Sequence, residues 1–361
     1  MRILIVDTCY PAFIEAHYRG HPGLADAPYE EQWRSLMDTF FGTADSYSHF
    51  LRPLGHEAHE LVANCEQLQS AWAREHGVRR PHLGLGRRGW PQRLVLEQAR
   101  EFQPDVVYVQ NLHFLTRSTL RRLKRHARLV AGQIASEAPP EPQLRSFDLL
   151  LTSFPHFVER FRALGVASEY LRIGFDPRVL DRLEAESAQQ ATGGAVFVGG
   201  LNRTQHAGGN ALLERAAQRA PIEFWGYRAE DWPESSAIRR SYRGEAWGLD
   251  MFRLLRSARI SVNRHIEVAE RFANNMRLYE ATGVGSLLLT DAKKNLHELF
   301  EPGREVETYG NEHELAEKVH RYLDDEEARA AVALRGQERT LREHGYGERM
   351  KELAAILEAR L

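Results

Sequence analysis

The chain has 361 residues, of which 43% are hydrophobic and 27% charged, and its formal net charge at pH 7 is −2. This composition excludes a disordered protein, and the charge balance argues against a general nucleic-acid binder, whose binding domain is clearly basic. Two cysteines, Cys9 and Cys65, exclude a disulfide framework and suit a reducing compartment. No apolar run approaches the roughly 20 residues that span a bilayer, and no signal pattern precedes Arg2. We therefore expect a cytoplasmic protein, with peripheral membrane contact left open.

The length predicts two domains, because one ordinary core rarely grows to this size. In the first half, short apolar runs alternate with helical patterns, which is typical of a parallel α/β sheet. The predicted strands are 2–6, 57–62, 106–110, 129–134, 149–152 and 169–173, and the predicted helices are 47–54, 91–102, 115–126 and 155–164. A long insertion at 9–45 follows the first strand, and such loops often carry function.

A polar stretch at 181–194 predicts a linker to a second alternating series. Its predicted strands are 195–198, 222–225, 260–262, 286–290 and 305–308, and its predicted helices are 211–220, 249–257, 276–282 and 312–323. A charged helical tail covers 326–361, with an interruption at 344–347. The second half therefore also predicts a parallel-sheet domain.

Two strand ends in the second half carry glycine. Gly199 and Gly200 follow the first strand, and glycine there could let a ligand approach the backbone, while Asn202 and Arg203 lie in the same loop. An ordinary turn is the alternative. The next strand ends in Trp225, Gly226 and Tyr227, where a flat base could lie against the backbone, or Trp225 could belong to the core.

The third strand end carries the main polar constellation. Three arginines are candidate partners for phosphate: Arg264, Arg271 and Arg277. Asn274 or Asn275 can cap the next helix and aim its amides at a diphosphate. Glu280, about one turn further, can accept both hydroxyls of a ribose. The alternative makes Arg277 and Glu280 an i,i+3 surface pair. This pattern favours a nucleoside-diphosphate sugar as the ligand.

Three segments, at 196–202, 222–227 and 274–291, read VFVGGLN, IEFWGY and NNMRLYEATGVGSLLLTD, and the pattern continues to 350. These segments resemble the GT-B glycosyltransferases, and more closely the CgeB-like branch with a "glycosyl transferases group 1" domain. The resemblance implies an α/β protein with two Rossmann-like parallel-sheet domains that face each other across a cleft. The implied limits are 1–180 for an acceptor domain, 195–340 for a donor-nucleotide domain and 341–361 for a helix that packs back toward the first domain.

By the same resemblance Glu280 is the ribose-binding glutamate of the family motif. The motif places another glutamate eight residues earlier, where this chain has Phe272. In the enzymes that it resembles, this earlier glutamate contacts the transferred sugar. The departure leaves the sugar and the stereochemical outcome open.

The implied reaction moves a sugar from a nucleoside-diphosphate sugar to a hydroxyl acceptor without a metal or another cofactor. Arg203, Arg264 and Arg271 are the leading candidates for stabilising the departing phosphate. An inverting reaction needs a base from the first half, for which there are four candidates: Asp7, His17, His21 and His113. His17 and His21 are not expected to form a metal site, because Gly20 and Pro22 should break the helix that would align them.

Two alternatives stay open. A sugar-nucleotide epimerase can use the same fold, although the long aromatic insertion favours a separate acceptor. The missing glutamate motivates the other alternative, a non-catalytic relative that binds a nucleotide or a partner. The residues leave open the nucleobase of the donor and whether the acceptor is a glycan, a lipid, a small molecule or a protein.

Overall fold

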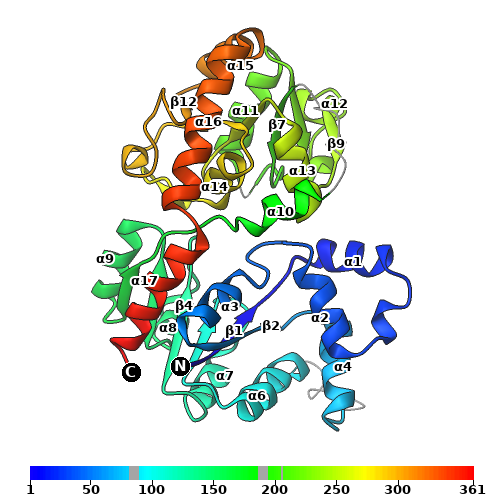
Figure 1. Cartoon of the computed structure of the whole chain (residues 1–361), viewed down its shortest axis with the longest axis vertical. Helices are drawn as coiled ribbons and strands as arrows, with labels where there is room; N and C mark the ends of the chain where they lie inside the picture. Colours follow the sequence, from blue (N-terminus) through cyan, green and yellow to red (C-terminus); the bar gives the residue numbers. More distant parts are fainter. Residues whose placement is uncertain (81–88, 186–193, 205) are drawn as a thin grey trace. The chain divides into compact units, whose positions relative to one another are not determined.

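The computed structural model describes residues 1–80, 89–185, 194–204 and 206–361, and these form two compact units (Figure 1). Unit 1 comprises Met1–Arg172 and Tyr346–Leu361, and unit 2 comprises Ile173–Gly345. Most of the linker expected at 181–194 lies outside the described residues, since only 181–185 and 194 are described. No helix in the described ranges is long and apolar enough to cross a membrane.

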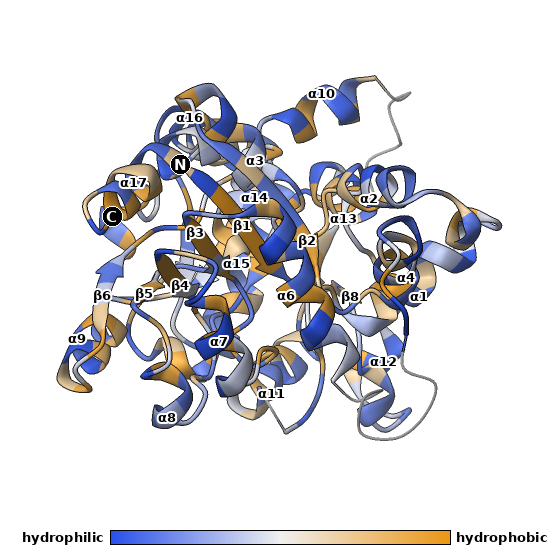
Figure 2. Ribbon diagram, turned by 90° about the horizontal axis from the view of Figure 1, so that it is seen from below, coloured by the Kyte–Doolittle hydropathy of each residue, from blue (hydrophilic) through white to orange (hydrophobic). Residues whose placement is uncertain are grey.

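Unit 1 contains a six-stranded parallel sheet with the strand order β2-β1-β3-β4-β5-β6. Its strands are β1 (Arg2–Asp7), β2 (Glu57–Val62), β3 (Val106–Val109), β4 (Leu129–Gln133), β5 (Leu149–Thr152) and β6 (Ala167–Tyr170). All four residues of β3 and of β5 are buried, as expected for strands that helices cover on both faces. Figure 2 shows β3 and β4 in the colour of hydrophobic residues.

The helices of unit 1 include one formed late in the chain. They are α1 (Pro11–Gly20), α2 (Tyr29–Met37), α3 (Ser46–Leu51), α4 (Glu66–Glu75), α6 (Trp90–Phe102), α7 (Arg117–Leu123), α8 (Glu141–Leu144), α9 (Pro155–Ala163) and α17 (Tyr346–Glu358). Helix α17 packs against α3, and the ring of Tyr346 lies 5.6 Å from that of Tyr47. The last helix of the chain therefore belongs to unit 1.

Unit 2 contains a second six-stranded parallel sheet, with the order β12-β11-β10-β7-β8-β9. Its strands are β7 (Ala195–Val198), β8 (Ile222–Trp225), β9 (Tyr242–Gly244), β10 (Ile260–Asn263), β11 (Leu287–Asp291) and β12 (Glu307–Tyr309). Its helices are α10 (Arg178–Glu184), α11 (Ala207–Ala217), α12 (Ala237–Arg240), α13 (Leu249–Ser257), α14 (Met276–Gly283), α15 (Glu312–Asp324) and α16 (Glu326–Glu343).

Several local predictions differ from the structure. The insertion at 9–45 contains α1 and α2, where the sequence showed only a long loop. Strand β6 starts at Ala167 and ends at Tyr170, which pairs with Thr152, the last residue of β5. Strand β9 was missed, because its three residues are not buried and show no apolar run. Helix α7 starts after Thr116, whose hydroxyl accepts a hydrogen bond from the Thr119 amide.

Gly226 is required where β7 and β8 end side by side. Its φ is +134°, and a Cβ atom there would lie 1.9 Å from the carbonyl oxygen of Gly199.

We expect Gly226→Ala to lower the free energy of unfolding by at least about 3 kcal/mol, since the clash is with backbone and the φ is strained. The measurement is urea unfolding. Gly194→Ala, where no atom lies within 4 Å of the added Cβ, is the control and should change little. Equal unfolding midpoints for the two variants would contradict the clash.

Candidate active site

The strand order of unit 2 reverses between β7 and β10, which are neighbours in the sheet. In open parallel sheets a ligand binds at such a switch point, beyond the carboxyl ends of the strands. Gly200 follows β7 there, Arg264 follows β10, and Tyr227 follows the adjacent strand β8. The sheet therefore brings together the three strand ends that the sequence singled out.

Arg264 is a buried cation at this switch point. Its Nη2 donates to the carbonyl of Gly200 at 2.9 Å, and its Nε donates to Oδ1 of Asn210 at 2.9 Å. The guanidinium also lies 5.5 Å from the ring of Phe197. Within the described ranges no carboxylate forms an ion pair with it, and burial lowers its pKa. The charges of Glu267 and Asp291 oppose this shift from a longer distance. A buried cation without a carboxylate in direct contact is an electrostatic site for an anion.

The glycines of this region make room for the protein itself. A Cβ on Gly200 would lie 2.8 Å from the hydroxyl of Tyr227, and one on Gly209 would lie 2.5 Å from Cδ of Arg264. The close neighbours of Gly200 and Gly226 are thus parts of the protein, and the predicted approach of a ligand to these glycines stays a prediction. Their missing side chains let neighbouring strand ends pack closely.

Two aromatic rings stack beyond β8. The rings of Tyr227 and Trp247 are 5.9 Å apart with an interplanar angle of 15°. Trp247 was missed in the sequence, because it precedes α13 far from the glycine pattern. Trp225 is half-buried, and its Nε1 has no hydrogen-bond partner among the described residues. The indole N–H of Trp225 is therefore a buried donor without a partner among the described residues, at the end of the strand next to β7.

Neither predicted asparagine caps α14. Asn275 occupies the N-cap position, but its Nδ2 donates to Oδ1 of Asn263 at 2.9 Å and to the carbonyl of Arg264 at 3.2 Å. Asn274 is buried and accepts from the hydroxyl of Tyr279 at 2.8 Å. Both side chains make these contacts instead, and the N-cap side chain makes no hydrogen bond to the amides of the first turn. Such a helix end favours an anion.

Arg277 and Glu280 form a buried pair rather than a surface pair. Nη1 of Arg277 lies 2.9 Å from Oε2 of Glu280, and the two side chains are only 13% and 10% exposed. Nη2 of Arg277 donates to the carbonyl of Val198, the last residue of β7, at 3.3 Å. Arg277 is therefore engaged by the protein on both sides, and its predicted contact with phosphate stays a prediction. Burial raises the pKa of Glu280, although Arg277 opposes the shift.

One oxygen of Glu280 is left for a ligand. Among the hydrogen bonds and ion pairs of the described residues, only Oε2 has a partner, and Oε1 is not fully covered. A carboxylate with one fixed oxygen and one open oxygen can accept a hydroxyl hydrogen in a defined direction.

The remaining predicted residues of unit 2 lie around this centre. Arg203 is exposed, with its guanidinium 5.3 Å from the ring of Trp232. Arg271 is exposed in the loop before α14. The carbonyl of Asn202 accepts from Nδ2 of Asn210 at 2.7 Å, which links that loop to the side chain holding Arg264.

Sequence reasoning missed a histidine–carboxylate pair beside Arg264. Nδ1 of His265 lies 2.7 Å from Oδ1 of Asp291, and Lys293 lies 3.3 Å from the other carboxylate oxygen. Although burial opposes it, the hydrogen bond from His265 and the charges of His265 and Lys293 hold the pKa of Asp291 below its usual range. The available signal was that both residues sit at the ends of adjacent predicted strands.

In unit 1 the strand order reverses between β1 and β3, and Asp7 is the last residue of β1. Burial raises its pKa to about 6, although the Thr8 amide donates to its Oδ1 at 2.7 Å. Asn111, after β3, donates from Nδ2 to the Thr8 hydroxyl at 2.7 Å. Asp7 therefore lies at the switch point of unit 1, at the end of the strand that corresponds to β7 of unit 2.

The three histidines proposed as candidate bases have different surroundings. The rings of His17 and His21 are 4.6 Å apart, so the expected separation was wrong: α1 continues through Gly20, and His21 is its C-cap. Burial, with His21 adding to it, lowers the pKa of His17 to about 4. His113 is exposed and lies within 2.9 Å of the Glu137 carbonyl through Nε2. Among the described residues no group of three or more His, Cys, Asp or Glu side chains could hold a metal ion.

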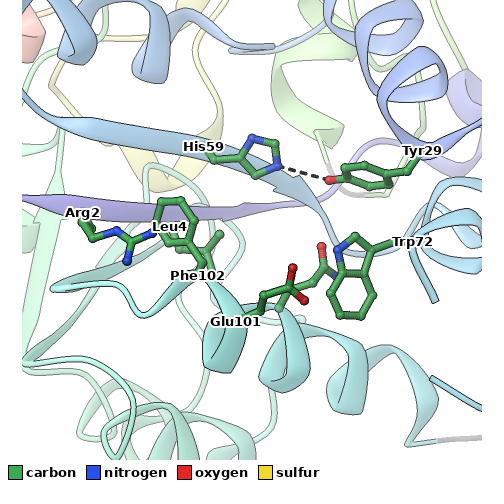
Figure 3. A pocket seen from close by; sticks show the side chains of 8 residues that line it. Arg2, Leu4, Tyr29, His59, Trp72, Glu101 and Phe102 are labelled. Atoms are coloured by element: carbon green, nitrogen blue, oxygen red, sulfur yellow. Dashed lines mark hydrogen bonds between the residues drawn. The ribbon is translucent and has the colours of Figure 1, made fainter. Parts of the chain in front are cut away.

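Unit 1 also has a cavity of about 280 Å³ between its sheet and α4 and α6 (Figure 3). It is lined by Arg2, Leu4, Tyr29, His59, Trp72, Gln98, Glu101 and Phe102. Arg2 begins β1, so the cavity opens far from the carboxyl end of that strand, where Asp7 lies. It contains none of the predicted site residues.

Residues 203–355 match a family model described as glycosyl transferase-like. The matched stretch contains Arg264, Arg277 and Glu280 of the switch-point site. No curated protein matches the chain.

Solved structures share the fold over nearly the whole chain. Anabaena HepE in complex with UDP-glucose is 15% identical, with a TM-score of 0.61, and the match covers 99% of this chain and 100% of HepE. Sucrose-phosphate synthase from Thermosynechococcus elongatus is 11% identical, with a TM-score of 0.60 and coverages of 99% and 98%. A glycosyltransferase of avilamycin A biosynthesis is 15% identical, with a TM-score of 0.55 and coverages of 98% and 96%. The predicted GT-B fold is confirmed.

The buried pair predicts a pH-dependent loss of stability in Arg277→Gln, because the Glu280 carboxylate then lacks its counter-charge. A carboxyl group whose folded pKa lies above its unfolded value loses folding free energy as the pH rises through that interval. The deficit of the variant should therefore grow with pH and reach about 3 kcal/mol at about pH 8.

Urea unfolding over a pH series measures this deficit. Arg304→Gln breaks an exposed pair of the same i,i+3 spacing and should cost less than about 1 kcal/mol. A deficit in Arg277→Gln that is small or independent of pH would show that the pair is solvated.

Proposed function

We propose that this chain, which carries a glycosyl transferase-like domain at 203–355 in a GT-B fold, transfers a sugar from a nucleoside-diphosphate sugar to a hydroxyl acceptor. The proposal rests on two arginine side chains, those of Arg264 and Arg277, which donate hydrogen bonds to backbone carbonyls at the end of β7. Arg264 donates to the carbonyl of Gly200, and Arg277 donates to that of Val198 while it holds Glu280. A free cation and an oriented carboxylate are what a diphosphate joined to a ribose needs.

The donor is proposed to lie along α14. Its diphosphate contacts Arg264 and the amides of the first helical turn, and its ribose donates a hydroxyl hydrogen to Oε1 of Glu280. Glu280 is five residues beyond the N-cap Asn275, which is about 7.5 Å along a helix. That spacing suits a ribose next to its phosphates.

The chemical step breaks the bond between the sugar C1 and the terminal phosphate oxygen, which keeps the electron pair. The acceptor oxygen forms the new bond to C1 and gives up its proton. Arg264 stabilises the negative charge that grows on the phosphate, and Arg203 and Arg271 add positive charge nearby.

Among the four candidates, Asp7 is proposed to take the acceptor proton. It lies at the switch point of unit 1, and burial raises its pKa to about 6, close to the neutral pH at which a general base works best. His17 is a weaker candidate because burial lowers its pKa to about 4. His21 and His113 lie away from the end of β1 in the chain, and His113 is exposed.

Replacing Glu280 tests the donor site. We expect Glu280→Gln to weaken nucleoside-diphosphate binding about tenfold or more, because a charge-assisted hydrogen bond to the ribose is lost. Titration calorimetry with UDP, GDP, ADP and dTDP measures it, with Glu298→Gln, an exposed glutamate of the same unit, as the control. Unchanged affinity of Glu280→Gln for the nucleotide that the wild type binds would remove Glu280 from the site.

Replacing Asp7 tests the acceptor side. Since a base must be deprotonated to act, wild-type turnover should rise with pH through about 6. Asp7→Asn should lose this limb and at least about a hundredfold in turnover, with donor binding unchanged. If the turnover of Asp7→Asn still rises with pH through about 6, the titrating group is not Asp7.

The same assay separates the alternatives. Formation of a C2 epimer of the donor without transfer indicates an epimerase. Nucleotide binding without turnover in acceptor mixtures indicates a non-catalytic relative.

A further inference from the structure

Helix α7 and the turn that follows it carry an unusual set of charges. Residues 117–128 contain six arginine or lysine residues and no aspartate or glutamate. We define the basic face as the exposed side chains of Arg117, Arg121, Arg122 and Arg125. The buried residues of the helix are Thr119, Leu120 and Leu123, so the cations lie on its solvent side.

None of these four arginines has an ion pair or side-chain hydrogen bond among the described residues. The two other cations of the segment are engaged: Lys124 lies 2.6 Å from Asp148, and Arg128 donates to the carbonyl of Leu361. Neighbouring helices pair their arginines internally, as Arg145 does with Glu141 and Arg100 with Glu97. The chain as a whole has a net charge of −2, so this local excess is not a property of its composition.

The excess of positive charge also destabilises helix α7. Arg117, Arg121 and Arg125 are spaced four residues apart, and a hydrogen bond from the Arg125 amide to the Arg122 carbonyl continues the turn beyond α7. Like charges at this spacing repel each other. Arg117 stands at the first position of the helix, where the macrodipole disfavours a cation. Stability of α7 therefore does not explain the basic face.

We propose that the basic face docks unit 1 onto an anionic lipid bilayer. A surface of exposed arginines without an exposed apolar residue in the helix suits lipid phosphates, which attract arginine by charge without insertion of side chains. Single-stranded nucleic acid fits less well, because its binding sites add aromatic stacking platforms, and the aromatic residue of this region, Phe114, is not exposed. The inference is independent of the proposed reaction.

Vesicle co-sedimentation of the full chain, without nucleotide, tests the proposal. We expect binding to phosphatidylcholine vesicles that contain phosphatidylglycerol, no binding to pure phosphatidylcholine vesicles, and release at high salt, because screening shortens the range of the attraction. Each cation near an anionic surface contributes roughly fivefold in affinity. The quadruple variant R117Q/R121Q/R122Q/R125Q should therefore bind up to several hundredfold more weakly.

The matched control removes the same charge elsewhere. The variant R19Q/R34Q/R145Q/R215Q replaces four exposed arginines that are paired with carboxylates, and it should bind vesicles nearly as the wild type does. Both variants should keep the melting temperature of the wild type, since no buried side chain changes. Three results would overturn the proposal: no binding to the anionic vesicles, equal binding by wild type and the basic-face variant, or equal loss in the two quadruple variants. Binding to heparin or RNA but not to vesicles would assign the face to a polyanion instead.

Discussion

The contact between the Arg264 guanidinium and the Gly200 carbonyl joins the ends of β7 and β10, and the arrangement of unit 2 around its switch point depends on it. A buried arginine can occupy this position because two neutral acceptors, that carbonyl and the Asn210 side chain, take two of its five N–H donors. Neutral partners leave the positive charge without a carboxylate in direct contact. The same bonds that fix the strand ends therefore also produce the field that an anion would meet.

Arg277 illustrates the opposite use of a guanidinium. It is paired with a carboxylate in a buried setting, and such pairs contribute little net stability because desolvation offsets the attraction. What the pair does provide is geometry: one oxygen of Glu280 is held by a residue that is itself anchored on the last carbonyl of β7. Two arginines thirteen residues apart in the chain thus serve different purposes at one strand end, and the difference follows from their partners.

Much of the fold could be predicted, because central strands such as β3 and β5 are uninterrupted apolar runs and the helices between them have clear start and stop residues. Short elements with partial burial, such as β9, give no such signal. The identity of the main site residues could also be read from their positions after strands. Their partners could not, since the pairing of His265 with Asp291 depends on the register between β10 and β11, and that of Asn275 with Arg264 depends on the path of the loop after β10.

The glycines also show that the sequence does not identify the contact partner of a residue. A glycine after a strand indicates close approach, but the sequence does not say of what. At Gly200 it is the hydroxyl of Tyr227, and at Gly226 it is the backbone of Gly199. In a sequence, a glycine that lets two parts of the chain pack closely looks the same as a glycine that lets a ligand approach the backbone.

Unit 1 is discontinuous in the chain, because it takes up Tyr346–Leu361 after the whole of unit 2 has been traversed. During synthesis, domains generally fold from the amino end as they emerge. Unit 2 is continuous and can complete its own sheet first, whereas the surface of α3 that receives α17 stays uncovered until that helix has been synthesised. Synthesis of unit 1 therefore begins before that of unit 2, but unit 1 completes its fold only after unit 2 has been synthesised.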